Sequence, residues 1–128
     1  MRVSFGDLRI GPIARKYIER ALNRSWVSQG PNVEEFEKRF AQKFDYKHAI
    51  ATSSGTDACI CACAALYDFG AKRGDEIIVP ACTFVATANA VLAAGFRPKF
   101  VDIELETLNI DPSKVVDAIS ERTVAVMA

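Results

Sequence analysis

The first 47 residues have the hydrophobic spacing of helices. Apolar side chains recur every three or four positions with charged side chains between them, which is typical of amphipathic helices. The pattern predicts one helix that opens at Pro12 and ends near 23–25, and a second over 33–44 with Asn32 as its N-cap. Between them, proline at position 31 disfavours the helical conformation of the residue before it. We therefore expect residues 1–47 to form a helical N-terminal segment.

From residue 48 onward, short apolar runs bounded by turn residues alternate with helical patterns. Runs of this kind are typical of buried strands in a parallel sheet. The expected strands are 48–51, 76–79, 99–103 and 123–127, and the expected helices are 57–69, 85–94 and 112–120. The order β-α-β-α-β-α-β predicts an α/β domain over 48–128, with a mostly parallel sheet and helices on both of its faces. Its crossovers should be right-handed.

Two turns, each expected to follow a strand and precede a helix, have the residues of a ligand site. The first, 52–57, reads Thr-Ser-Ser-Gly-Thr-Asp. Its glycine permits close backbone approach, its hydroxyls can donate hydrogen bonds, and the first N–H groups of the following helix lack internal partners. These properties suit a phosphate cradle, whereas an ordinary N-cap is the alternative, because Ser, Thr and Asp cap many helices. Since ligands of such sheets bind beyond the carboxyl ends of strands, the second turn, 80–84, should lie at the same edge.

Phe84 lies in this second turn. Its ring could stack on a flat aromatic ligand that bears a phosphate, or it could simply belong to the core. We interpret Asp102, at the end of an expected strand, as structural. His48 is the only histidine of the chain, and we interpret it as a strand-edge residue.

Composition argues against several classes of partner. The 128 residues include 16 Lys and Arg and 16 Asp and Glu, so a nucleic acid or an anionic membrane is not the expected partner. No apolar run approaches a membrane span, and the N-terminus lacks the apolar core of a signal peptide, so we expect a cytoplasmic protein.

The cysteines, at positions 59, 61, 63 and 82, lack zinc-site spacing. Cys59 and Cys63 are poorly placed for a disulfide, and we expect all four thiols to be small buried groups.

A series of motifs resembles the N-terminal part of the DegT/DnrJ/EryC1/StrS aminotransferases. The motifs occupy 26–31 (Trp-Val-Ser-Gln-Gly-Pro), 33–37, 54–58, 74–80, 83–91, 100–103 and 109–112, and as a set they span nearly the whole chain. Members of this family are fold-type I enzymes that use pyridoxal 5'-phosphate to aminate keto-sugars, mostly nucleotide-linked ones. The resemblance implies that residues 48–128 are an incomplete part of the large domain of such an enzyme.

The resemblance also implies roles for individual residues. The backbone of Gly55, Thr56 and Asp57, with the Thr56 hydroxyl, would hold the cofactor phosphate, and Phe84 would stack on the pyridine ring. It further implies a homodimer or other self-association, a small-molecule keto-sugar substrate, and glutamate as the amino donor.

The catalytic groups of the family have no match here. The lysine that forms the Schiff base and the aspartate that pairs with the pyridinium nitrogen are expected beyond residue 128. None of the lysines lies in a matching motif; they are Lys16, Lys38, Lys43, Lys47, Lys72, Lys99 and Lys114. We assign no catalytic residue and no metal ligand, and we expect the chain alone to be inactive. Two alternatives stay open, namely a non-catalytic module that binds a phosphorylated ligand, and a module that self-associates through the strand edge at 123–127.

Overall fold

The structure is a computed structural model that describes residues 6, 8–26 and 28–128. The chain forms two compact units, Met1–Ala51 and Thr52–Ala128. The expectation that the N-terminus lacks a signal peptide concerns residues 1–7, most of which lie outside the described residues. Val27 of the motif 26–31 also lies outside them. The domain division expected at 47/48 stays a prediction.

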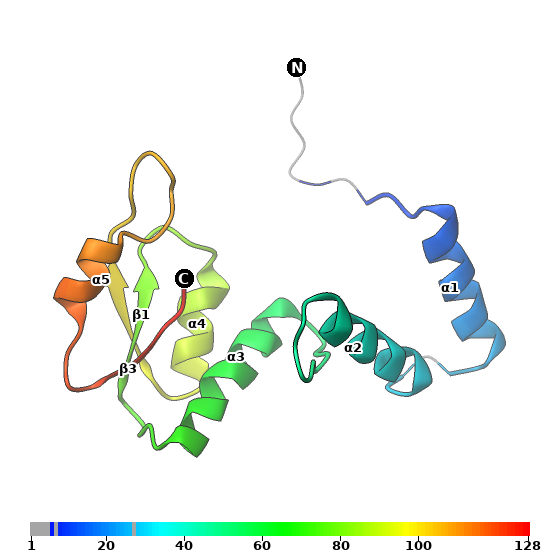
Figure 1. The fold of residues 1–128 in the computed structure, drawn as a ribbon, viewed down its shortest axis with the longest axis horizontal. Coiled ribbons are helices and arrows are strands. Elements are labelled where there is room, and N and C mark those ends of the chain that lie inside the picture. Colours follow the sequence, from blue (N-terminus) through cyan, green and yellow to red (C-terminus); the bar gives the residue numbers. More distant parts are fainter. Residues whose placement is uncertain (1–5, 7, 27) are drawn as a thin grey trace. The chain divides into compact units, whose positions relative to one another are not determined.

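The first unit contains the two predicted helices, α1 (Pro12–Asn23) and α2 (Pro31–Lys43) (Figure 1). Each begins on a proline, whose fixed φ suits the first helical turn and whose missing N–H is not needed there. The prediction of Asn32 as an N-cap was wrong, because helix α2 already begins at Pro31 and Gly30 is its N-cap.

The predicted apolar face of α2 is present but remains partly exposed. Phe36, Phe40 and Phe44 form a ladder with ring-centroid distances of 5.8 and 4.6 Å. Among the described residues of α1 and α2, only Ala41 is buried. The described part of the first unit therefore has almost no core of its own.

The strand predicted over 48–51 is absent. The segment is irregular and pairs with none of the strands in the described chain. The side chain of Ile50 is 84% exposed, and the Ala51 N–H donates to the Glu37 carboxylate at 2.7 Å rather than to a neighbouring strand. The prediction was wrong because apolar composition shows that a segment suits burial, whereas a strand also needs a partner for its backbone hydrogen bonds. His48 is consequently an exposed residue of an irregular segment and not a strand-edge residue.

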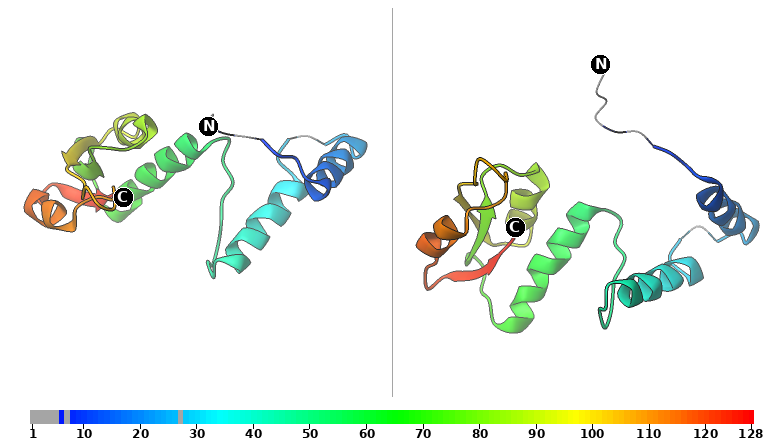
Figure 2. Two further views of the ribbon diagram at one scale, coloured as in Figure 1. Left: turned by 90° about the horizontal axis from the view of Figure 1, so that it is seen from above. Right: turned by 45° about the horizontal axis from the view of Figure 1, so that its top comes forward.

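The second unit is an α/β structure around a three-stranded sheet (Figures 1 and 2). Its elements are α3 (Gly55–Ala65), the 3-10 helix η1 (Leu66–Phe69), β1 (Glu76–Pro80), α4 (Val85–Ala93), β2 (Arg97–Val101), α5 (Pro112–Ala118) and β3 (Thr123–Val126). The strand order is β2-β1-β3, and both strand pairs are parallel. Helix α5 lies on one face of the sheet and α4 on the other (Figure 2). The predicted class, a parallel sheet with helices on both faces, is confirmed.

The core lies between strand β1 and the helices α3 and α4. It consists of Cys63, Ile77, Val79, Val91 and Phe96, all of them buried. The central strand β1 is apolar on both faces, which explains its unbroken run of buried residues.

Helix α3 is less buried than its sequence predicts. Although it is apolar on all sides, Cys63 is its only buried residue, because the helix packs on one side only, against α4 and β1. The four thiols are free, and the expectation that all would be buried was wrong for Cys61 and Cys82, which are exposed. Burial raises the pKa of the Cys63 thiol, with a further contribution from neighbouring Cys59.

On the opposite face, a polar cluster ties the strands together near their N-terminal ends. The carboxylate of Glu76 on β1 accepts hydrogen bonds from the Ser120 hydroxyl at 2.7 Å and from the Lys99 ammonium at 3.3 Å. These two hydrogen bonds, that of Ser120 first, lower the pKa of Glu76.

A hairpin connects β2 to α5. Ile103 and Ile110 form an isolated antiparallel bridge, so the predicted strand 99–103 stops as a regular strand at Val101. The Asp102 carboxylate accepts from the Ile103 N–H at 2.8 Å, and the Asp102 carbonyl accepts from the Asp111 N–H at 3.1 Å. These bonds agree with a structural role for Asp102.

Candidate cofactor site

The N-terminus of helix α3 has two open backbone donors. Ser54 is the N-cap: its hydroxyl accepts from the Asp57 N–H at 3.1 Å, and its carbonyl accepts from the Ala58 N–H at 3.0 Å. The structure gives the backbone N–H groups of Gly55 and Thr56 no acceptor among the described residues. Unpaired N–H groups at the positive end of a helix dipole make a site for an anion.

Asp57 belongs to the cap itself. Its carboxylate accepts hydrogen bonds from the Ser53 hydroxyl and from the Ser54 hydroxyl, the latter at 3.0 Å. These bonds, Ser53 first and Ser54 next, lower the pKa of the Asp57 carboxyl. Among the three residues predicted to hold the phosphate, Gly55 and Thr56 therefore offer open donors, whereas the Asp57 N–H already has a partner. The Ser-x-x-Asp spacing of 54–57, which resembles a capping box, is the sequence signal for this arrangement.

Gly55 has no internal reason to be glycine. A Cβ atom at this position would meet no heavy atom within 4 Å, and its φ lies outside the left-handed region. The space beside the backbone is open to a ligand, so the residue fits the close approach of a phosphate group.

Phe84 sits where the second turn meets helix α4. It is the N-cap residue of α4, and the Thr87 N–H donates to its carbonyl at 2.9 Å. The Thr83 and Thr87 hydroxyls lie 3.1 Å apart and help to fix the turn. The side chain of Phe84 is 73% exposed, so the alternative that it is a core residue was wrong.

The structure brings the two turns to the same end of the second unit. Helices α3 and α4 pack against each other and run in the same direction, as Figure 1 shows. Near their C-terminal ends, the Tyr67 hydroxyl donates to the Ala94 carbonyl at 2.8 Å. Gly55 and Phe84 both stand at the N-terminal ends of these helices. They consequently lie together on the side of the sheet where β1 ends. Only the second turn directly follows a strand, because the segment before the first is irregular.

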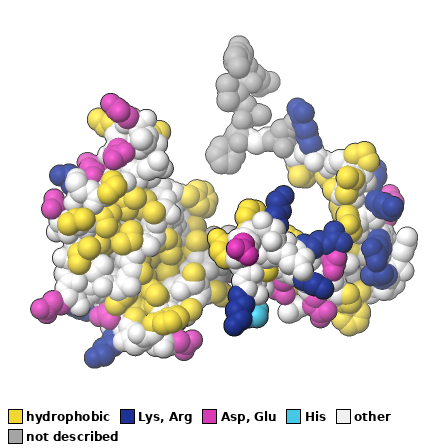
Figure 3. Space-filling view, in the orientation of Figure 1, with side chains coloured by type: hydrophobic (Ala, Val, Ile, Leu, Met, Phe, Trp, Pro, Cys, Tyr) yellow, Lys and Arg dark blue, Asp and Glu magenta, His cyan; other side chains and the backbone are white. Residues whose placement is uncertain are grey.

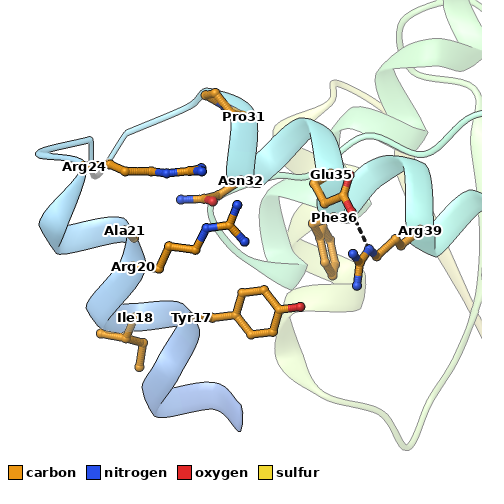
Figure 4. A pocket seen from close by; sticks show the side chains of 10 residues that line it. All are labelled: Tyr17, Ile18, Arg20, Ala21, Arg24, Pro31, Asn32, Glu35, Phe36 and Arg39. Carbon is orange, nitrogen blue, oxygen red and sulfur yellow. Dashed lines mark hydrogen bonds and ion pairs between the residues drawn. The ribbon is translucent and has the colours of Figure 1, made fainter.

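The first unit has a groove of its own between α1 and α2, with a volume of about 780 Å³ (Figure 4). Tyr17 and Phe36 supply aromatic walls, and Arg20 points into the groove. Arg39 is held by Glu35 through a 2.6 Å ion pair, which raises the pKa of the guanidinium, with a smaller contribution from Tyr17. The groove contains none of the residues predicted to bind the cofactor, so we do not assign it to that site.

Among residues 6, 8–26 and 28–128, no group of His, Cys, Asp and Glu side chains is arranged to hold a metal ion. In the same residues, no helix combines the length and the apolar character needed to cross a membrane.

A parallel sheet with helices on both faces, and with an open helix N-terminus and an exposed aromatic ring at one end, is an α/β arrangement that this chain shares with solved pyridoxal-phosphate-dependent enzymes. The chain belongs to the DegT/DnrJ/EryC1/StrS aminotransferase family, whose sequence model matches residues 9–128. The resemblance inferred from the motifs is thereby confirmed.

Individual relatives agree with this assignment. The chain is 42% identical over 118 residues to the spore coat polysaccharide biosynthesis protein SpsC of Bacillus subtilis (strain 168), covering 92% of this chain and 30% of that protein. It is 47% identical over 96 residues to the 3-oxo-glucose-6-phosphate:glutamate aminotransferase of the same organism, covering 75% of this chain and 21% of that protein. Among solved structures, E. coli GDP-4-keto-6-deoxy-D-mannose-3-dehydratase with bound hydrated PLP superimposes with a TM-score of 0.83 at 35% identity, covering 97% of this chain and 32% of that one. The chain thus spans about a third or less of the length of these relatives.

Proposed function

We propose that this chain is the N-terminal portion of a pyridoxal-phosphate-dependent aminotransferase that acts on keto-sugars, mostly nucleotide-linked ones. The observation that carries the proposal is the pair of open N–H groups on Gly55 and Thr56 at the same end of the unit as the exposed ring of Phe84. A phosphate and a flat ring are the two parts of the cofactor that such donors and such a ring can bind.

Each residue has a distinct role in this proposal. The Gly55 and Thr56 N–H groups and the Thr56 hydroxyl bind the phosphate, and the charged Asp57 holds Ser53 and Ser54 so that the helix begins at Gly55. The Phe84 ring covers one face of the pyridine ring and excludes water from it. When bound, the cofactor supplies the electron sink that amino-group transfer needs.

The second unit offers no amine to react with the cofactor. Lys99 bonds to Glu76 near the N-terminal ends of the strands, Lys72 follows η1 at the far end of α3, and Lys114 lies on α5, across the sheet from α3 and α4. Since no lysine of the chain lies in a motif that matches the family's Schiff-base lysine, we propose that the 128-residue chain binds the cofactor without covalent attachment and has no transaminase activity alone.

The names of two relatives support the proposed classes of substrate and donor. One relative is named for glutamate as its donor, and one neighbour is named for a GDP-linked keto-sugar. We propose the same classes for the whole protein, a nucleotide-linked keto-sugar and glutamate.

The test is a titration of the purified chain with pyridoxal 5'-phosphate, followed by absorbance and fluorescence. Pyridoxal, which lacks the phosphate, is the matched control ligand. We expect saturable binding of the phosphorylated form, competition by inorganic phosphate, and at least about tenfold weaker binding of pyridoxal, equal to about 1.4 kcal/mol. Absence of saturable binding would refute the cofactor cradle. A label fixed by borohydride at one lysine would refute the non-covalent part of the proposal.

A non-catalytic phosphate-binding module is the second candidate, and it is favoured by the same open donors of Gly55 and Thr56. The two candidates differ in the role of Phe84. If Phe84→Ala weakens binding of pyridoxal 5'-phosphate but not of inorganic phosphate, the ring is recognised and the cofactor proposal stands. If both ligands bind the variant as tightly as the original chain, the phosphate module is the better description.

A further inference from the structure

The segment 46–51, which leads into the phosphate cradle, is fastened to helix α2. At its start, the Tyr46 N–H donates to the Ala41 carbonyl at 2.8 Å. At its end, the Ala51 N–H donates to the Glu37 carboxylate at 2.7 Å. Ala41 and Glu37 are four residues apart on the helix, so they lie on the same face of α2. The segment therefore runs back along this face within the first unit and is held at both of its ends.

The Glu37 side chain is committed to this one contact. It is half-buried and forms no ion pair with any of the described residues, although Figure 3 shows many basic side chains on the visible face of the first unit. By contrast, Glu35 on the same helix pairs with Arg39 at 2.6 Å. A hydrogen bond from a backbone N–H to a carboxylate is stronger than one between neutral groups. Glu37 is thus a specific anchor for the backbone of Ala51.

The chain itself carries this anchor to the donors of the cradle. Ala51 is joined by a peptide bond to Thr52, whose hydroxyl donates to the Ser54 carbonyl at 2.9 Å. Ser54 is the N-cap of α3 and directly precedes the open N–H groups of Gly55 and Thr56. Each residue that is free to move before binding adds conformations that must be given up when a ligand is held. Fixing Ala51 therefore reduces the entropy that ligand binding at the cradle must overcome.

We propose that Glu37 is a positioning residue of the cofactor site. By holding the Ala51 N–H, it restricts the backbone that enters the turn 52–57, so that the phosphate meets donors that are already in place. Its role is to act through Ala51 and not to contact the ligand. The inference rests on the proposed function, and it gives a role to the last residue of the motif 33–37.

Titration of three variants with pyridoxal 5'-phosphate tests the role of Glu37. Glu37→Ala removes the acceptor, and Glu37→Gln keeps an oxygen that can accept the same hydrogen bond. Glu35→Ala is the matched control, because it removes a charge from the same helix without touching Ala51. Alanine, glutamine and glutamate all favour helices, so α2 should persist in each variant. We expect Glu37→Ala to bind at least about fivefold more weakly, and the other two to bind within about twofold of the original chain.

Exchange of single backbone amides in the ligand-free chain measures the bond itself. The Ala51 N–H should exchange at least about tenfold faster in Glu37→Ala than in the original chain or in Glu37→Gln. The Tyr46 N–H is the internal control, because it donates to the Ala41 carbonyl and should keep its rate in every variant.

Three results would overturn the proposal. They are unchanged affinity of a folded Glu37→Ala protein, an unchanged exchange rate of its Ala51 N–H, and a lower free energy of unfolding without any loss of affinity, as expected of a purely structural bond. If Glu37→Ala does not fold, Glu37→Asp takes its place, because it keeps the charge but withdraws the carboxylate from Ala51. The affinity of Glu37→Asp should fall in the same way, and an unchanged affinity would reject the role of Glu37. If the original chain does not bind pyridoxal 5'-phosphate, the proposed function fails, while amide exchange still decides whether Glu37 holds Ala51.

Discussion

Two glycines of the second unit should respond differently to replacement by alanine. Gly55→Ala should weaken ligand binding but not stability, whereas Gly70→Ala should lower stability but not binding. Gly55 has open space beside its backbone and no left-handed φ, whereas Gly70 caps η1 with φ of +92°. In Gly55→Ala the added methyl meets nothing, and alanine is the better helix former, so the free energy of unfolding should stay within about 0.5 kcal/mol of the original or rise. In Gly70→Ala the left-handed conformation costs roughly 1–2 kcal/mol, partly offset by the lower entropy of the unfolded chain, so the net loss should be about 1 kcal/mol.

Binding should follow the reverse order. The methyl group of Gly55→Ala occupies the space where the phosphate approaches the N–H groups of Gly55 and Thr56, so affinity for pyridoxal 5'-phosphate should fall at least about tenfold. Gly70→Ala lies at the other end of α3 and should bind normally at a temperature where it is folded. Urea denaturation gives the stabilities, and fluorescence titration gives the affinities.

Either of two outcomes would refute this reasoning about the cradle. The first is a Gly55→Ala protein that binds the cofactor as tightly as the original chain. The second is a Gly55→Ala protein that loses as much stability as Gly70→Ala, since that would mean that the glycine serves the fold rather than a ligand.

Two further substitutions, the second with a matched control at an exposed position, test other parts of the structure. Glu76 has a lowered pKa because Ser120 donates a hydrogen bond to its carboxylate. The stabilisation by Glu76 is therefore complete above the unfolded-state pKa of about 4.3, and it is lost as the pH falls through the folded-state pKa. The difference in unfolding free energy between the original chain and Glu76→Gln should be constant near neutrality and shrink below about pH 4. Val91→Ala should cost about 2 kcal/mol in urea denaturation because Val91 is fully buried, while Val116→Ala, at an exposed position, should change stability by less than about 0.5 kcal/mol.

The second unit was predictable because local and global signals agree in it. The strand pattern at 76–79 and the breaks at Pro80 and Gly95 specify β1 and the limits of α4 to within a residue or two, and the observed elements match them. Helix α5 follows the Asp111-Pro112 signal in the same way, since the Asp111 carboxylate accepts from the N–H groups of Ser113 and Lys114.

The remaining features depend on neighbours that a pattern of residues does not identify. The run 48–51 is apolar enough for a strand, but strand formation is a property of a pair of segments, and no partner lies beside it in the described chain. Helix α3 is apolar on all sides, yet how many of those sides are covered depends on tertiary packing. At the candidate site, the sequence indicates the cluster of hydroxyl groups, but only the structure shows that Ser53 and Ser54 bond to Asp57 and leave Gly55 and Thr56 open.

The bond from Tyr67 to the Ala94 carbonyl lies at the end of helices α3 and α4 that is far from the proposed cofactor site. It fixes helices α3 and α4 to each other near their C-terminal ends, where the Tyr67 ring also stacks on Phe96 with centroids 4.7 Å apart. In the proposed site, this contact would set the separation between Gly55 and Phe84 at the other ends of the two helices. The size of ligand that fits between them would then depend on Tyr67 and Phe96, which would not touch it.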